Sequence, residues 1–304
     1  FSRQSYFRRE SARTSPKTRQ EKSGGTIYCR GARTFIFTLF MKIQRISAIF
    51  LRQFYLLRRS PYRILNLLHW AFLDLIVWGL TLFYIYTAGN VKLNFLFVIL
   101  GAVILWNFLI RVQQGITISF LEDIWVRNFM NLFASPLTLN EYILGLVSIS
   151  IFQAFIQSTL MIFLAWILFA YNIFQFGFLL IPFIVVLFIF GLALGLFSTA
   201  FILRLGPSSE LLAWFIPAWI SPLAGVFYSV SALPYWVQFL AYALPPMYIF
   251  EGMRKIVLSG SFDLNDLFIA FTISVVSFIL AYWFLLRSYR YVLRRGLFTR
   301  FMTD

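Results

Sequence analysis

Long apolar runs separated by short polar segments are the feature that most constrains this chain. At about 1.5 Å per helical residue, about 20 apolar residues cross a hydrocarbon layer roughly 30 Å thick. Such runs are expected to be helical, because unpaired backbone groups are costly in lipid. The sequence therefore predicts an all-α membrane protein with six transmembrane helices, which we place at residues 64–88, 95–118, 142–170, 176–203, 211–228 and 264–286.

The composition excludes a water-soluble protein, since hydrophobic residues make up 61% of the chain and charged residues only 12%. A formal net charge of +15 would suggest a nucleic-acid partner for a soluble protein. Here most Lys and Arg lie outside the apolar runs, where they set membrane topology, so we expect no nucleic acid. Cys29 is the single cysteine, which excludes an intramolecular disulfide and a cysteine metal cluster.

The N-terminal segment, residues 1–40, differs from the apolar body that follows. It is rich in Ser, Arg, Gly and Thr and does not start with methionine. This composition predicts a disordered basic tail. We further expect that native translation starts at Met41 and that the tail is not part of the native protein. N-terminal sequencing of the native protein would overturn this expectation by finding any peptide from before Met41.

Residues 41–63 alternate basic and apolar side chains. This pattern predicts an amphipathic helix that lies in the membrane interface, with its cations toward anionic headgroups. The body that follows, residues 64–304, is expected to form one transmembrane domain. The basic residues of the interfacial segment are Lys42, Arg45, Arg52, Arg58, Arg59 and Arg63.

A polar island at residues 120–143 interrupts the apolar runs after the second expected span. Its first part has apolar residues at helical spacing and predicts an amphipathic surface helix. Ser135-Pro136 should end that helix, because a residue before proline disfavours the helical region. Thr138 and Glu141 then have the spacing of a capping box, which predicts the start of the next helix.

The block at residues 211–258 contains several helix-breaking prolines. It is too long for one span and too interrupted for two. We therefore expect the fifth span to end near Tyr228 and two short half-helices, at residues 234–243 and 247–258, to form a re-entrant hairpin before the sixth span. Irregular backbone at membrane depth is tolerated only against protein or a water-filled cavity, so this region should border a pathway. The breaking residues are Pro217, Pro222, Gly225, Pro234, Pro245 and Pro246.

The distribution of cations predicts the orientation. With six spans both termini and the island share one side, which carries most of the Lys and Arg. Only Lys92, Arg254 and Lys255 are expected on the other side. The positive-inside rule then places both termini and the island in the cytoplasm.

This organisation resembles the ABC-2 family of ABC transporter permease subunits. The segments that carry the resemblance are residues 131–142, NLFASPLTLNEY, and residues 245–254, PPMYIFEGMR. The likeness covers the chain from Met41 onward. It implies two paired copies, as a homodimer or with a related permease, and two ATPase subunits docked beneath them. It also implies alternating access, substrate export and a location in the bacterial inner membrane.

The chain has no Gly-x-x-x-x-Gly-Lys-Ser/Thr loop, so it lacks a motif that would bind nucleotide phosphates. We therefore expect it not to be an enzyme and to bind no cofactor, with ATP and Mg held by the partner ATPase. The resemblance identifies the island as the coupling segment that docks on this partner. In that interpretation Trp125 and Phe129 are buried anchors, Glu122, Asp123 and Arg127 are polar contacts, and Ser135, Pro136, Thr138 and Glu141 hold the segment rigid. The alternative is an island that lies on the bilayer with its aromatic face in lipid.

Polar residues within the expected spans and hairpin are candidates for the substrate pathway. Asp74 either lines the pathway or bonds to a neighbouring span. For Arg111 we favour extension of the side chain to the interface over a role in substrate entry. Glu251 and Arg254 have the spacing of an ion pair on one helix face. The complete candidate set is Asp74, Arg111, Gln114, Glu251 and Arg254.

Two other function classes compete with the permease interpretation. An intramembrane enzyme would need a nucleophile with a base or clustered metal ligands, and one histidine with dispersed carboxylates disfavours it. An ion-coupled secondary transporter or channel remains the alternative, although such proteins usually show repeated halves and several intramembrane ionisable groups. No motif in the sequence specifies the transported molecule.

Overall fold

The computed structural model describes residues 24–88, 93–206 and 209–295. The chain divides into two compact units, residues 1–44 and 45–304. The described part of the first unit is helical from Gly24, so the helix begins well before the interfacial segment predicted from Met41. Residues 1–23, which belong to the expected disordered tail, lie outside the described residues.

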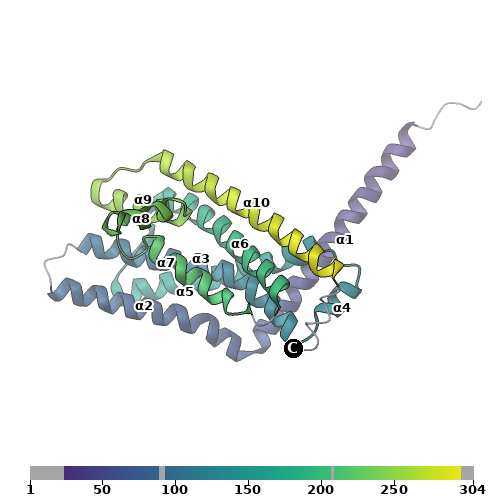
Figure 1. Cartoon of the computed structure of the whole chain (residues 1–304), viewed down its shortest axis with the longest axis horizontal. Helices are drawn as coiled ribbons and strands as arrows, with labels where there is room; N and C mark the ends of the chain where they lie inside the picture. The colour runs from purple at the N-terminus through teal and green to yellow at the C-terminus, as the bar shows by residue number, and fades with distance from the viewer. Residues whose placement is uncertain (1–23, 89–92, 207–208, 296–304) are drawn as a thin grey trace, which may run out of the picture. The chain divides into compact units, whose positions relative to one another are not determined.

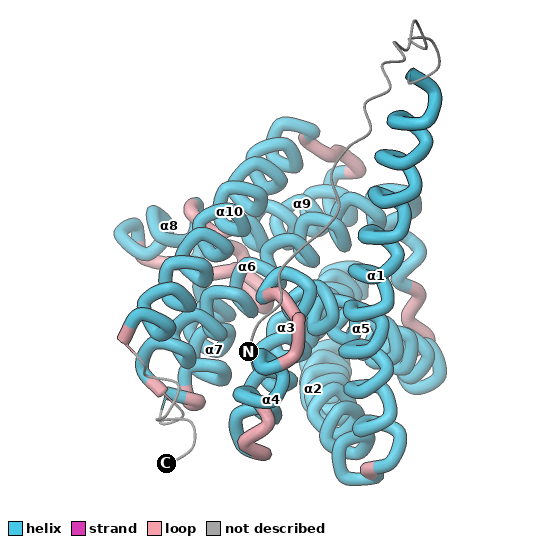
Figure 2. The backbone as a smooth tube through the Cα atoms, turned by 90° about the vertical axis from the view of Figure 1, so that its right-hand side faces the viewer, coloured by secondary structure: helices cyan, strands magenta, loops and turns pink. Residues whose placement is uncertain are grey.

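Helices joined by short loops make up the described residues, among which there is no strand (Figure 2). Ser60 separates the first two helices, and Pro61 starts the second, as its fixed φ favours at a first helical position. The helices are α1 (Gly24–Arg59), α2 (Pro61–Ala88), α3 (Leu93–Trp125), α4 (Phe129–Ala134), α5 (Leu139–Phe169), α6 (Leu180–Leu205), α7 (Leu212–Leu223), α8 (Tyr235–Tyr242), α9 (Pro245–Ser259) and α10 (Leu264–Arg294), with short 3₁₀ turns η1 (Ile173–Leu179) and η3 (Val230–Ala232).

Five of the described helical stretches are long and apolar enough to cross a membrane, and they coincide with five of the six expected spans. The fifth expected span is not among them. In its place α7 has 12 residues, about 18 Å of helix. Pro217 and Pro222 lie inside α7, and Gly225, with φ of 67°, follows its end. The described structure therefore does not confirm six full spans.

The centre of the unit is α3, which packs against α5 and α6, while α10 packs mainly along α6 (Figure 1). About 78% of the apolar window of α3 is buried, against 22% for α2, α5 and α10. Most of the apolar surface of those three helices is thus uncovered, as expected for helices in contact with lipid.

Two glycines bring α6 close to α3. A Cβ atom at Gly191 would meet the Leu109 carbonyl oxygen at 3.0 Å, and one at Gly195 would meet the Gln113 carbonyl oxygen at 3.1 Å. The Gly-x-x-x-Gly spacing puts both on one helix face, where small residues let membrane helices approach closely. Larger side chains at either position would push the two helices apart.

The segment from α7 to α9 carries the chain from one end of the unit to the other. At its start, Trp125 of α3 donates to Glu210, next to α7. Further along, the Trp78 ring of α2 stacks on Phe227 at 3.9 Å between centroids. At its end, Lys255 of α9 pairs with Asp266 of α10 at 2.6 Å. A broken path of short helices and loops therefore covers the distance that the sequence assigned to a continuous span and a hairpin.

Candidate functional site

The predicted surface helix of the polar island is divided between two helices. Residues 120–125 are the last turns of α3, which continues beyond its apolar run to Trp125. The chain then turns at residues 126–128, where Arg127 has a φ of 55°. The six-residue helix α4 follows. The single amphipathic helix of the sequence analysis is wrong in this respect, because the buried positions Leu121 and Ile124 continue the packing face of α3.

The end of the island has the predicted caps. Ser135 follows α4 in an extended conformation, and its hydroxyl donates to the Leu132 carbonyl at 2.6 Å. At the start of α5, the Thr138 hydroxyl accepts from the Glu141 amide at 3.4 Å, and the Thr138 amide donates to the Glu141 carboxylate at 2.9 Å. The capping box is therefore confirmed, and Pro136 lies exposed between the two caps.

Asp123 is the centre of a buried polar contact between three helices. Arg52 of α1 donates to both of its carboxylate oxygens, at 2.5 and 2.6 Å. The hydroxyl of Tyr142, from α5, donates to the same carboxylate at 2.6 Å. Asp123 is only 1% exposed, so it cannot be the surface contact for a partner that the sequence suggested. Its charge holds α1, α3 and α5 together.

Two further ion pairs surround this contact. Arg63, in the first turn of α2, lies 3.0 Å from Glu122, and Arg45 of α1 lies 3.5 Å from Glu141. The sequence pattern predicts that these arginines face lipid headgroups. For Arg45, Arg52 and Arg63 that prediction is wrong, because each pairs with an acidic residue in the segment 120–143. We call this segment the α3–α5 corner.

The exposed tip of the α3–α5 corner consists of Trp125, Val126 and Arg127. Trp125 is 53% exposed and Val126 is 65% exposed. The Trp125 indole donates to Glu210 at 3.1 Å, which fixes one edge of the ring and leaves a face open. Phe129, the second expected anchor, begins α4, but its side chain lies outside the described residues. The tip combines apolar area with a cation, as protein-docking surfaces often do.

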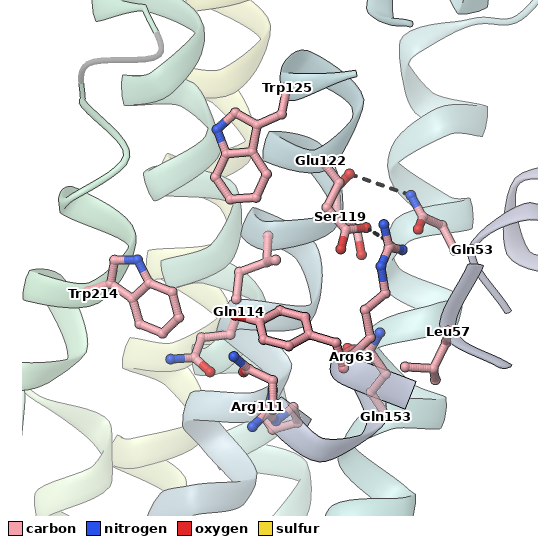
Figure 3. Close-up of a pocket in the computed structure, with 13 residues that line it drawn as sticks. Gln53, Leu57, Arg63, Arg111, Gln114, Ser119, Glu122, Trp125, Gln153 and Trp214 are labelled. Atoms are coloured by element: carbon pink, nitrogen blue, oxygen red, sulfur yellow. Dashed lines mark hydrogen bonds and ion pairs between the residues drawn. The ribbon is translucent and has the colours of Figure 1, made fainter. Parts of the chain in front are cut away.

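A polar cavity of about 230 Å³ lies beside this corner (Figure 3). Figure 3 shows Trp214 and Arg63 on opposite sides of it, with Gln114 between them. Arg111 is 6% exposed and donates to Gln157, so it does not extend to the interface as the sequence analysis favoured. The cavity is lined by Gln53, Leu57, Tyr62, Arg63, Asn66, Arg111, Gln114, Ile118, Ser119, Glu122, Trp125, Gln153 and Trp214.

Comparison with protein-family models matches residues 35–258 to the family of ABC-2 type transporters. This match spans most of the chain and both segments that carry the resemblance. The chain belongs to the ABC-2 type transporter family. It is an integral membrane protein, and members of this family are transport subunits that normally work with an ABC ATPase. No curated protein matches the sequence.

The remaining polar candidates of this ABC-2 chain lie away from the cavity. Asp74 of α2 accepts from Asn107 of α3 at 3.2 Å, so the bond to a neighbouring span is present. No group of His, Cys, Asp and Glu among the described residues could hold a metal ion.

Glu251 and Arg254 form the predicted ion pair, at 3.3 Å, and also bind the loop after α7. Glu251 accepts from the Ser229 hydroxyl and the Val230 amide, at 2.9 and 2.7 Å. Arg254 donates to the carbonyls of Gly225 and Val226. The pair therefore fixes α9 to the loop, beyond neutralising itself.

Sequence reasoning missed the partners of the corner acids. Arg45 and Arg52 are seven residues apart and so share one face of α1, which was an available signal. Nothing local distinguishes an arginine that meets a carboxylate from one that meets a lipid headgroup. Trp214 also escaped notice, because an aromatic residue in an apolar run carries no separate signal. Tyr142 ends the segment that carries the resemblance, but its hydrogen bond to Asp123 was not predicted.

Proposed function

We propose that this chain is the permease subunit of an ATP-driven exporter that moves its substrate by alternating access. A separate ATPase subunit holds ATP and Mg and supplies the energy. Two permease chains pair, as a homodimer or with a related permease, in the bacterial inner membrane with both termini in the cytoplasm. The family match supports the transport role, and the excess of cations on the terminal side supports the orientation.

The observation that best supports this proposal is the geometry of the α3–α5 corner. Its exposed tip, Trp125 to Arg127, is connected to α3 on one side and through α4 to the capped start of α5 on the other. A docked ATPase would press on the tip, and the ion pairs of Asp123 and Glu122 would pass that displacement to α1 and α2. Asp123 therefore acts inside the subunit, whereas Trp125 and Arg127 contact the partner.

The polar cavity is the proposed cytoplasmic entrance of the pathway. It lies where α1, α2, α3, α5 and α7 meet, so displacement of the corner changes its walls. The broken path from α7 to α9 supports the re-entrant character of that region, since irregular backbone at membrane depth borders protein or water. Arg111 and Gln114 line the entrance. Asp74, Glu251 and Arg254 maintain helix contacts outside it.

The test is co-purification from mild detergent. We expect the tagged native chain to retain an ATPase, and a Trp125→Ala, Val126→Ser variant to lose most of it, because interface anchors commonly cost 2 kcal/mol or more when truncated, roughly thirtyfold in affinity. The readout is the ATPase-to-permease ratio after gel filtration. Thermal unfolding of the variant should match that of the native chain, since both side chains are largely exposed.

Trp236→Ala is the matched control, because Trp236 is 72% exposed but lies in α8, away from the corner. It should retain the ATPase. Equal loss in the control and the test variant would reject the docking site. A stable native chain that never co-purifies with an ATPase would reject the ATP-driven assignment and favour the ion-coupled alternative.

A further inference from the structure

The last turns of α10 carry arginines on one side of the helix. Arg287, Arg290 and Arg294 recur at intervals of three and four residues and are exposed, while Ala281, Leu285, Ser288 and Val292 are buried. The two sets occupy largely opposite faces of the helix. The arginines therefore face away from the packing surface of α10, toward lipid or water.

Aromatic rings hold several of these cations in place. The Arg287 guanidinium lies 5.5 Å from the centroid of the Trp283 ring. Arg204 of α6 and Arg295 both lie over Tyr291, at 4.9 and 4.8 Å from its centroid. Such contacts orient a guanidinium without neutralising it. The arrangement leaves an open cavity of about 490 Å³, lined by Trp283, Leu286, Arg287, Arg290, Tyr291, Arg294 and Arg295.

The charge of this cluster is uncompensated within the described chain. The ion pairs among the described residues use Arg45, Arg52, Arg63, Arg254 and Lys255 as cations. None of them includes Arg204 or an arginine of α10. Some of this charge complements the helix dipole and sets topology, but those effects need no cavity and no ordered guanidinium groups.

We propose that this arginine cradle (Arg287, Arg290, Arg294 and Arg295) binds the phosphate-bearing headgroup of an anionic phospholipid. Charge complementarity selects the anion, and the planar guanidinium groups match phosphate oxygens in bidentate geometry. The apolar run of α10 lies directly before the cradle and offers a surface for the acyl chains. Trp283 lies at the boundary between the apolar run and the arginines, and amphipathic aromatic rings commonly lie at the membrane interface.

The test measures lipid binding to the purified full chain in detergent, by native mass spectrometry with phosphatidylglycerol and phosphatidylcholine as probes. We expect the native chain to prefer phosphatidylglycerol. An Arg287→Gln, Arg290→Gln, Arg294→Gln variant should bind it about a hundredfold more weakly, since each of the three cations near an anionic surface contributes roughly fivefold. An Arg→Lys variant at the same positions should fall between the two, because lysine keeps the charge but not the bidentate geometry.

The matched control removes the same charge from the predicted interfacial segment, through Lys42→Gln, Arg58→Gln and Arg59→Gln, all at exposed positions. These cations would attract an anionic bilayer surface but do not line the cradle cavity, so they should matter little for lipid bound in detergent. It should retain most of the phosphatidylglycerol binding. Equal loss in both glutamine variants would overturn the cradle in favour of diffuse attraction, as would equal binding of the two lipids. Displacement of the lipid by an equal concentration of inorganic phosphate would reassign the site to a soluble anion.

Discussion

Two carboxylates at different places in the chain are neutralised in different ways. Asp123 pairs with Arg52, 71 residues away in sequence and on another helix. Glu251 pairs with Arg254, one turn away on its own helix. The first pair holds separate helices together, whereas the second forms within α9 and uses its remaining hydrogen bonds to fix a loop. The Asp123–Arg52 pair is a tertiary contact that would change if α1 moved. The Glu251–Arg254 pair is a local clamp.

The largest expected effect comes from removing the tertiary contact. Asp123→Ala would leave the Arg52 guanidinium and the Tyr142 hydroxyl without their shared acceptor. We expect a loss of about 3 kcal/mol in unfolding free energy, as for other broken buried ion pairs. Chemical denaturation in detergent measures this. Tyr142→Phe is the control and should lose only about 1 kcal/mol. Equal losses in the two variants would show that the Arg52 contact is unimportant.

A smaller and more local effect is expected at the clamp. Arg254→Met would remove the donor to the Gly225 and Val226 carbonyls and the cation beside Glu251. We expect a loss of about 2 kcal/mol in unfolding free energy. The loss is smaller than for Asp123→Ala, because methionine also removes the cost of burying a charge, which offsets part of the lost hydrogen bonding. Hydrogen exchange should rise at residues 225–231 and stay unchanged in α1. Faster exchange in α1 would contradict the distinction between tertiary contact and local clamp.

The capping box should contribute less than either ion pair. Thr138→Ala removes the acceptor for the Glu141 amide at the first turn of α5. A loss of about 1 kcal/mol is expected from measured N-cap substitutions. Thr138→Ser keeps the hydroxyl and should restore most of it in the same denaturation measurement. Failure of serine to do so would assign the effect to packing of the threonine methyl group.

The smallest effect is expected at the outermost ion pair. Arg45 is 30% exposed at its side chain and lies 3.5 Å from Glu141. Arg45→Ala should therefore cost only about 0.5 kcal/mol, and less at high salt. Comparing denaturation at low and high salt checks this. A salt-independent loss above that of Asp123→Ala would reverse the ranking of the corner contacts.

Local signals predicted the parts of the structure that depend on near neighbours. The cap at Thr138 and Glu141 and the stop at Ser135 lie within a few residues of one another, so the sequence contains their whole mechanism. The five long apolar helices were predictable for the same reason, since length and hydropathy suffice. The ion pair of Glu251 and Arg254 is also local, and it was predicted.

Long-range pairing limited the prediction of the site. Arg52 and Asp123 meet only because α1, α3 and α5 pack together, and Arg111 finds Gln157 in the same way. For polar side chains with no partner nearby in the sequence, the predicted contacts were therefore lipid, water or another protein. The break at Arg127 was missed because continuous apolar spacing favoured a single helix. The prolines of α7 were visible in the sequence. How far they shorten the helix depends on packing, which the sequence does not show.

The close approach of α6 to α3 at Gly191 and Gly195 has a mechanical consequence. At these two positions the backbones meet without an intervening layer of large side chains, so we expect the two helices to move as one rigid body. Relative motion must then occur at α2 and α7, which form the opposite walls of the cavity. Spin-label pairs in a Cys29→Ser background would separate these cases: in the complex with its ATPase, ATP should shift a pair between Val77 and Trp219 and leave one between Ile110 of α3 and Leu205 of α6 unchanged. The glycine pair would thus make α3 and α6 a fixed frame relative to which α2 and α7 move.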